Sequence, residues 1–243
     1  MPRFFVLAHR FSAMRMRSRL LLSLAAAVLL AAAVNAHAQF GAPAPGTQVN
    51  DATALHPPAG ARVAIVEFAD MECPACANAN TTLKAAAATY KIPWVRHDFL
   101  IPGHIWSPVA AVNARWFEAT KGKAVGDEYR DQVFANQASI YNLAVLHQFT
   151  EKFAQSHGIS LPFAIDPQGK LAAAIKADGD LGVRTGIKAT PAVWVVTEHS
   201  KGAPYMEVAN GMSNLYQLID QALADTAPAK PAPKPPVKKP AGK

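Results

Sequence analysis

The chain has 243 residues, a formal net charge of +7 and only two cysteines. Of the 24 basic residues, five arginines lie within residues 1–38 and five lysines within residues 226–243, and neither segment contains an acidic residue, which leaves 14 basic against 17 acidic residues elsewhere. The part that can fold is therefore mildly acidic, and this balance excludes a basic nucleic-acid-binding face.

The first 38 residues have the three parts of an export signal. A basic region over residues 15–19 precedes an apolar run over residues 20–34, interrupted only by Ser23, and residues 36–38 (AHA) match a small-residue cleavage pattern. The run is shorter than the roughly 20 residues that a membrane-spanning helix needs. We therefore expect cleavage before Gln39 and export to the periplasm, with an uncleaved anchor as the alternative.

Two further segments differ in composition from the rest. Residues 39–60 are rich in Pro, Gly and Ala, and we expect a flexible N-terminal segment there. Residues 226–243 alternate Pro, Ala and Lys without apolar periodicity, which predicts a disordered tail. The tail is either a solubilising extension or a cationic tether to an anionic envelope surface. Residues 61–225 remain for one domain.

The domain begins with a strand, a helix and a second strand. Residues 62–68 (RVAIVEF) are apolar on both faces except at Glu67, which predicts a buried central strand. A helix is predicted from residue 73 to about residue 90, with Pro74 at its first position, where the missing N–H costs nothing. Residues 94–100 predict a second strand, parallel to the first after a right-handed crossover.

An all-helical block follows at about residues 103–185, and strands then return. Helices are predicted from Ser107, which would cap the first of them, and over residues 127–135, 143–157 and 170–182. Residues 192–196 (AVWVV) predict a buried strand and residues 205–208 a weaker strand antiparallel to it. Ser213 is expected to cap a final amphipathic helix.

The two cysteines stand in Cys73-Pro74-Ala75-Cys76, directly after the first strand. A helix N-terminus stabilises a thiolate, and a second thiol within one turn can attack a mixed disulfide, so this arrangement indicates thiol–disulfide exchange. In an exported compartment such a pair can persist as a disulfide. A structural staple, contributing only about 2 kcal/mol across so short a loop, is one alternative. A zinc site is another, although His97 and His104 lack the usual ligand spacing.

Several other side chains near the motif have two interpretations each. Burial would raise the pKa of Glu67 and suit it to exchanging a proton with Cys76, or Glu67 simply reaches water at a strand end. Met71, Trp106 and Trp194 line a peptide groove or, as such residues more often do, pack in the core. His104 is expected to be an ordinary loop histidine.

The order β-α-β, helical block, β-β-α resembles the α/β thioredoxin fold with an all-helical insertion, as in the exported DsbA-like disulfide oxidoreductases. The matching segments are residues 67–76 (EFADMECPAC), 129–137 (YRDQVFANQ) and 186–191 (GIKATP). The resemblance implies that Cys73 is the nucleophile and Cys76 the resolving thiol. It also implies that Pro191 is a cis-proline facing them, preceded by Thr190, and that Glu67 is a buried acid that assists proton movement.

A cis bond before Pro191 would expose the Thr190 backbone for pairing with an extended substrate peptide. Base rates alone would favour an ordinary trans proline that begins a strand.

The resemblance implies an exported thiol–disulfide oxidoreductase that promotes disulfide formation in cysteine-containing exported proteins. We expect a monomer with no metal and no separate cofactor, recycled by a membrane quinone-linked oxidase. The strongest oxidants of the family carry a histidine where this chain has Ala75, and Asp70 and Glu72 precede Cys73. We therefore expect a less acidic Cys73 and a less oxidising couple.

Two alternatives to this function stay open. One is a disulfide reductase of the same fold, and the other is a non-catalytic binding or chaperone module on a thioredoxin-like scaffold. An isomerase is disfavoured, because residues 39–60 are too short for the N-terminal dimerisation domain that such isomerases carry.

Overall fold

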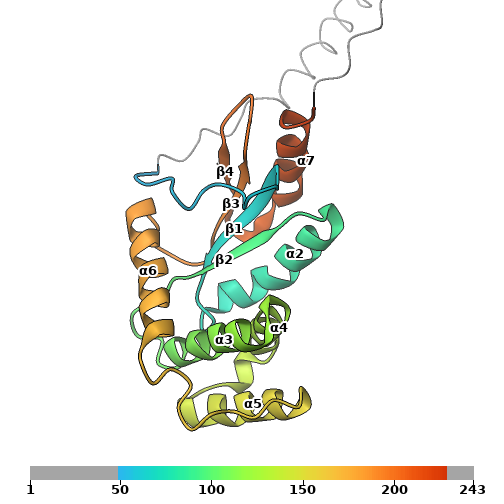
Figure 1. Cartoon of the computed structure of the whole chain (residues 1–243). Coiled ribbons are helices and arrows are strands. Elements are labelled where there is room, and N and C mark those ends of the chain that lie inside the picture. Colours follow the sequence, from blue (N-terminus) through green and yellow to red (C-terminus); the bar gives the residue numbers. More distant parts are fainter. Residues whose placement is uncertain (1–48, 229–243) are drawn as a thin grey trace, which may run out of the picture. The chain divides into compact units, whose positions relative to one another are not determined.

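The computed structural model describes residues 49–228 (Figure 1). The predicted export signal and almost all of the predicted tail lie outside the described residues. The elements, in chain order, are β1 (Val63–Ala69), α2 (Pro74–Tyr90), β2 (Trp94–Asp98), α3 (Ser107–Lys121), α4 (Lys123–Ala135), the short 3-10 helix η2 (Gln137–Ser139), α5 (Leu143–Ser156), α6 (Lys170–Thr185), β3 (Ala192–Thr197), β4 (Tyr205–Glu207), the short 3-10 helix η3 (Asn210–Met212) and α7 (Leu215–Asp225).

The four strands form one mixed sheet in the order β2-β1-β3-β4. β1 pairs in parallel with β2, as the predicted crossover requires, and antiparallel with β3, while β4 pairs antiparallel with β3. The register places Glu67 of β1 between Arg96 of β2 and Val193 of β3. Glu67 therefore stands in a central strand with a neighbour on each side.

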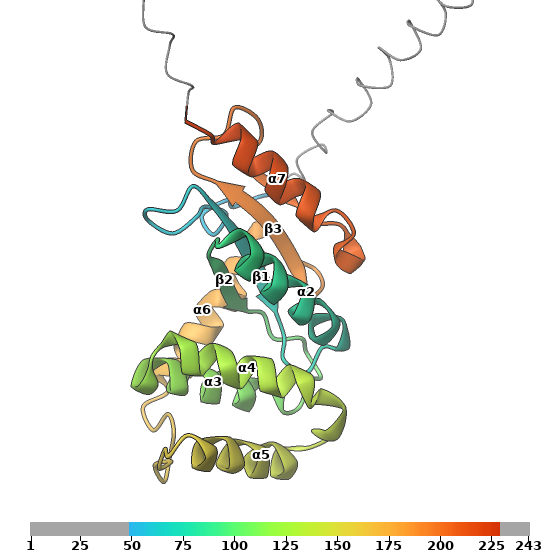
Figure 2. The same cartoon turned by 90° about the vertical axis from the view of Figure 1, so that its right-hand side faces the viewer.

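Both faces of β1 are buried, because helices cover the sheet on both sides (Figures 1 and 2). Val63 and Ile65 point to the face on which α2 and α7 pack. Ala64, Val66 and Phe68 point to the opposite face, where Leu181 of α6 packs. This explains why β1 reads as a continuous apolar run instead of alternating with polar residues.

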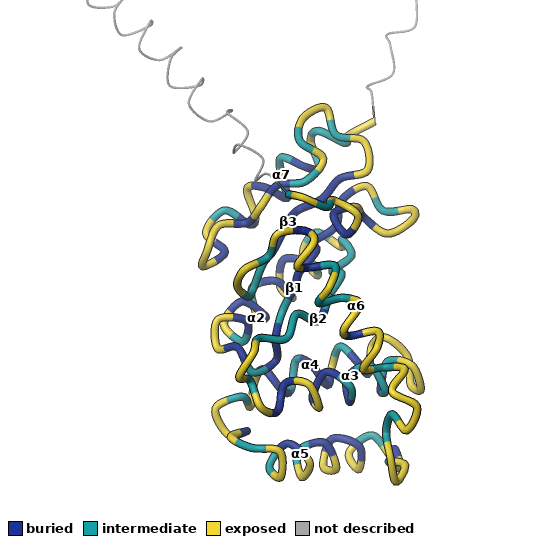
Figure 3. Tube along the Cα trace, turned by 90° about the vertical axis from the view of Figure 1, so that its left-hand side faces the viewer, coloured by how far each residue is buried: buried dark blue, intermediate teal, exposed yellow. Residues whose placement is uncertain are grey.

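The helical block has an apolar core of its own, built from α3, α4 and α5. Its large buried side chains include Phe117, Tyr129, Leu146 and Phe153. Buried residues alternate with exposed ones along α5, which has one side against this core (Figure 3). The same cluster includes Cys73 and Cys76. The helical block therefore packs directly against the cysteine motif.

A buried charge network joins this block to the edge of the sheet. The Asp98 carboxylate accepts hydrogen bonds from Arg130 of α4 and, at 2.7 Å, from Nε of Arg115 of α3. Arg115 also pairs with Asp178 of α6, whose carboxylate accepts the backbone N–H of Asp98 at 3.1 Å. Burial by itself would raise the pKa of Asp98, but the charges of Arg130 and Arg115 outweigh it and hold that pKa below its ordinary value.

Residues 49–60 are the part of the expected N-terminal segment that the structure describes. Residues 49–60 lie against the sheet, with Ala54 and Leu55 buried beside Val66. The side chain of Asp51 pairs with Arg184 at 3.0 Å, and the N–H of Asn50 donates to the carbonyl of Thr185. Ala54 and Leu55 thus belong to the apolar cluster on this face of the sheet, while most of the other residues of the stretch are exposed or half-buried.

The predictions that Ser107 and Ser213 cap helices are both wrong. α3 begins at Ser107 itself, and the Ser107 hydroxyl is buried without a hydrogen-bond partner among residues 49–228. At α7 the residue preceding the helix is Asn214, and its side-chain oxygen accepts from the backbone of Ala209, not from the helix. In both cases the surrounding chain supplies contacts that local cap propensity does not include.

Candidate active site

The C-x-x-C motif lies at the junction between the end of β1 and the start of α2. Cys73 is the residue before the helix and has extended backbone angles, φ −79° and ψ 119°, while Pro74 occupies the first turn. The carbonyl of Cys73 accepts from the N–H groups of Cys76 at 3.1 Å and Ala77 at 3.2 Å, which starts the helix. Both thiols are free in this structure. The first turn of α2 thus holds the two cysteines close together at its N-terminus.

The loop before β3 faces the first cysteine. The Thr190–Pro191 peptide bond is cis, the conformation that the family resemblance implied. The Cys73 Sγ donates a hydrogen bond to the carbonyl oxygen of Thr190 at 3.5 Å. Residues 117 positions apart in the sequence therefore meet at the thiol.

The second cysteine is in a different environment from the first. Cys76 has 0 % of its surface exposed, whereas Cys73 keeps 9 %. Burial raises the pKa of the Cys76 thiol above its ordinary value, and the nearby Glu67 adds to that effect. Cys73 is thus the thiol of the pair that a reactant in solution can reach.

Glu67 lies beneath α2 and does not reach water at the strand end. It is 1 % exposed, and its Oε2 accepts a hydrogen bond from Trp94 Nε1 at 3.0 Å. Oε1 has no hydrogen-bond partner among residues 49–228. Burial raises the pKa of Glu67 from 4.5 to about 7, and the charge of Arg96 opposes this rise. The carboxyl group can therefore take up or release a proton near neutral pH.

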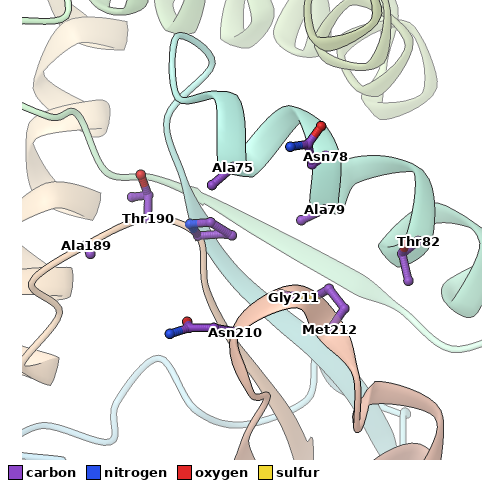
Figure 4. A pocket seen from close by; sticks show the side chains of 10 residues that line it. Ala75, Asn78, Ala79, Thr82, Ala189, Thr190, Asn210, Gly211 and Met212 are labelled. Atoms are coloured by element: carbon purple, nitrogen blue, oxygen red, sulfur yellow. The ribbon is translucent and has the colours of Figure 1, made fainter.

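A cavity of about 310 Å³ opens beside the motif (Figure 4). Three segments line it, and the figure shows α2, the loop before β3 and the η3 segment around the same space. The lining residues are Ala75, Asn78, Ala79, Thr82, Ala189, Thr190, Pro191, Asn210, Gly211 and Met212. The cavity thus borders both the motif and the cis-proline loop.

The two acidic residues before Cys73 have donors of their own. The Asp70 carboxylate accepts the N–H groups of Glu72 at 2.7 Å and Ile101 at 2.8 Å, and it lies 3.0 Å from Nδ1 of His104. His104 is therefore not an ordinary loop histidine, because it faces a fully buried carboxylate.

Glu72 has a structural partner as well. Its Oε2 accepts the N–H groups of Trp106 at 2.8 Å and Ser107 at 3.0 Å, and thereby caps α3 in place of the expected serine.

Gln137 of η2 contacts the backbone of the cysteine motif, and the sequence did not predict this contact. Its side-chain amide donates to the carbonyl oxygens of Met71 at 2.9 Å and Cys73 at 3.0 Å. The residue lies in the segment that resembles the family's insertion, but its distance of 64 positions from Cys73 gave no local signal.

The three candidates for a groove, Met71, Trp106 and Trp194, are all buried core residues. Within the described part of the chain, no group of three or more His, Cys, Asp or Glu side chains could hold a metal ion, and no helix is long and apolar enough to cross a membrane.

Comparisons with known proteins agree on the fold. The sequence model of a family described as thioredoxin matches residues 58–208. Among solved structures, α-DsbA1 of Wolbachia pipientis has a TM-score of 0.55 at 17% identity and covers 71% of this chain and 92% of its own. BdbD of Bacillus subtilis, in its oxidised form, has a TM-score of 0.55 at 18% identity, with 76% and 98% covered. No curated protein matches.

Proposed function

Since the chain belongs to the thioredoxin family and shares its fold with DsbA-type thiol–disulfide oxidoreductases, we propose that it is an exported enzyme that promotes disulfide formation in cysteine-containing proteins. The observation that carries this proposal is the contact of Cys73 Sγ with the Thr190 carbonyl, beside a cavity that an extended peptide could enter. Export to the periplasm rests on the sequence of residues 1–38.

In the oxidising direction the enzyme begins with a Cys73–Cys76 disulfide. A substrate thiolate attacks Sγ of Cys73, the disulfide breaks, and Cys76 leaves as a thiolate that takes up a proton. A second substrate thiolate then attacks the substrate sulfur of the mixed disulfide and expels Cys73. The substrate loses two electrons and two protons, and the cysteine pair gains them. A membrane quinone-linked oxidase is the partner that we propose for returning the pair to the disulfide.

Glu67 is proposed as the group that exchanges the proton with Cys76. Its burial beneath α2 and its pKa of about 7 allow it to donate to the leaving thiolate and to accept a proton in the reverse step. Pro191 and Thr190 are proposed to bind the substrate backbone beside Cys73. The redox centre in this proposal is the cysteine pair, without a separate cofactor.

The reduction potential tests the direction of electron flow. We expect a value between about −120 mV, typical of the strongest oxidants, and about −270 mV, typical of thioredoxin, because Ala75 supplies no positive charge beside Cys73. The measurement is equilibration of residues 39–243 in glutathione buffers, combined with reactivation of a reduced, denatured disulfide protein. A potential at the thioredoxin end, with fast insulin reduction and no reactivation, would instead establish the reductase, which the neutral Pro74-Ala75 pair also suits.

Replacing Glu67 by glutamine is expected to slow exchange by on the order of a hundredfold, the lower end of what general acid–base catalysis contributes. The amide cannot deliver a proton to Cys76, but it can keep the bond from Trp94 Nε1. Stopped-flow fluorescence between pH 5 and 9 measures the rate, with Glu128→Gln as the control for loss of an exposed carboxylate. Equal rates for the two variants at every pH would contradict the role of Glu67.

The same variant has an expected effect on stability. Folding raises the pKa of Glu67 from 4.5 to about 7, so the folded state favours the protonated form, and the free energy of unfolding falls as the pH rises through this window. Glu67→Gln removes this loss. We expect it to be more stable than the parent at pH 8, by up to about 3 kcal/mol, and no more stable at pH 4. Urea unfolding at both pH values measures the difference.

A further inference from the structure

Arg96 is the cation closest to the proposed proton-transfer group, but Glu67 is not its main partner. The two residues are neighbours in the parallel register of β1 and β2, so their side chains share the face beneath α2. Nε of Arg96 lies 3.9 Å from Oε2 of Glu67 and makes no hydrogen bond within residues 49–228. The pair is thus in electrostatic contact without a hydrogen bond.

The guanidinium is held instead by groups from two helices. Its Nη2 donates to Oδ1 of Asp131 at 2.8 Å and also to the side-chain oxygen of Asn80. Its Nη1 lies 3.7 Å from Oδ1 of Asp127. Its central carbon lies 3.6 Å from the centre of the Trp94 ring, which supports its flat face. These contacts fix the guanidinium in one orientation, with its hydrogen bonds directed at α4 and α2.

We propose that Asp131, on the helical insertion, is a positioning residue for proton transfer by Glu67: it binds the Arg96 guanidinium and prevents it from forming a full ion pair with the Glu67 carboxyl. A full pair would keep the carboxyl ionised and remove it from proton exchange near neutral pH. The insertion therefore has a part in the chemistry through α4, and not only in covering the motif. The role of Glu67 itself rests on the proposed function.

All charged groups around Glu67 affect the balance between the protonated and ionised forms of its carboxyl. Arg96 from β2 and Arg130 from α4 favour the carboxylate, and Asp131 from the same helix disfavours it. Trp94 favours the carboxylate form of Glu67 through its hydrogen bond. Cys76 of α2 interacts electrostatically with Glu67. Lys84 of α2 pairs with the second oxygen of Asp131 at 2.7 Å, and Asp127 is the other acidic neighbour of Arg96. Among them, Asp131 is the acid that directly hydrogen-bonds Arg96.

The test is the titration of the Glu67 carboxyl carbon by ¹³C NMR in the reduced protein, with the resonance assigned by its loss in Glu67→Gln. In Asp131→Asn the midpoint is expected to fall by roughly half a unit to one unit, because a like charge is removed and Arg96 is freed. Asp131→Glu, which keeps the carboxylate, is expected to restore most of the parent's midpoint. The acid limb of the exchange rate against pH should move in the same direction.

Glu128→Gln is the matched control, because it removes one carboxylate from the same helix, where Glu128 contacts His157 and Gln132 instead of Arg96. Its midpoint should equal that of the parent. An Asp131→Asn midpoint equal to the control's, or higher, would overturn the role of Asp131. This outcome is separate from failure of the proposed function. If the parent protein exchanges no disulfides, but the Glu67 midpoint is still lower in Asp131→Asn than in the parent, the function is overturned and the electrostatic role of Asp131 is not.

Discussion

Cys73→Ala is expected to lower the rate of thiol–disulfide exchange by at least about a thousandfold, because the reaction then has no accessible sulfur. Cys76 cannot take over, since it is fully buried and its thiol pKa is raised, so its thiolate is scarce. Insulin reduction and the oxidation of a two-cysteine peptide measure the rate in both directions.

Cys76→Ala is expected to behave differently. Cys73 still attacks a substrate disulfide, but no second thiol resolves the product, so mixed disulfides should accumulate and appear on a non-reducing gel. The double variant controls for folding and should form none. A Cys73→Ala protein that still forms mixed disulfides would contradict the assignment of the nucleophile. Full biological function in the double variant would favour the non-catalytic binding module.

Arg130→Met is expected to cause the largest loss of stability, about 1.5–3 kcal/mol, because the buried Asp98 carboxylate loses its bidentate partner and keeps Arg115 as its remaining arginine contact. Methionine keeps much of the apolar volume of the arginine stem, so the loss reports the charge. Chemical denaturation at pH 7 measures it. Asp98→Asn combined with Arg130→Met should lose less than the sum of the two single changes, because the two side chains interact directly and each single change already breaks that interaction.

The pH dependence of this loss has a definite sign. The folded-state pKa of Asp98 lies below its unfolded value, so its stabilisation is complete above the unfolded pKa and disappears as the pH falls through the folded pKa. The difference between Arg130→Met and the parent should therefore shrink in acid. Lys176→Ala, which breaks an exposed pair with Asp180, is the control and should cost no more than about 0.5 kcal/mol. A similar loss in both variants would mean that the network contributes little.

Local patterns were sufficient to predict most elements of the fold. The apolar residues of β1 and the proline after Cys73 each mark a structure that forms over a few neighbouring positions. The same strand pattern left two interpretations of Glu67 open, and the structure shows the buried one. Sequence reasoning failed where partners are far apart along the chain. Nothing near Ser107 indicates that Glu72 would cap its helix, and nothing near Asp131 indicates a contact with Arg96 of a neighbouring strand.

The cysteine motif is attached to the insertion through Glu72 to the start of α3 and through Gln137 to η2, which follows α4. The insertion is consequently not a removable module. A shortened protein with a direct loop from β2 to β3 would lose the donors that hold Glu72 and the amide that holds the Cys73 carbonyl. Transfer of this redox centre to a minimal scaffold would therefore require new hydrogen-bond partners for Glu72 and for the Cys73 carbonyl. Without them, the conformation of the active-site loop would no longer be fixed.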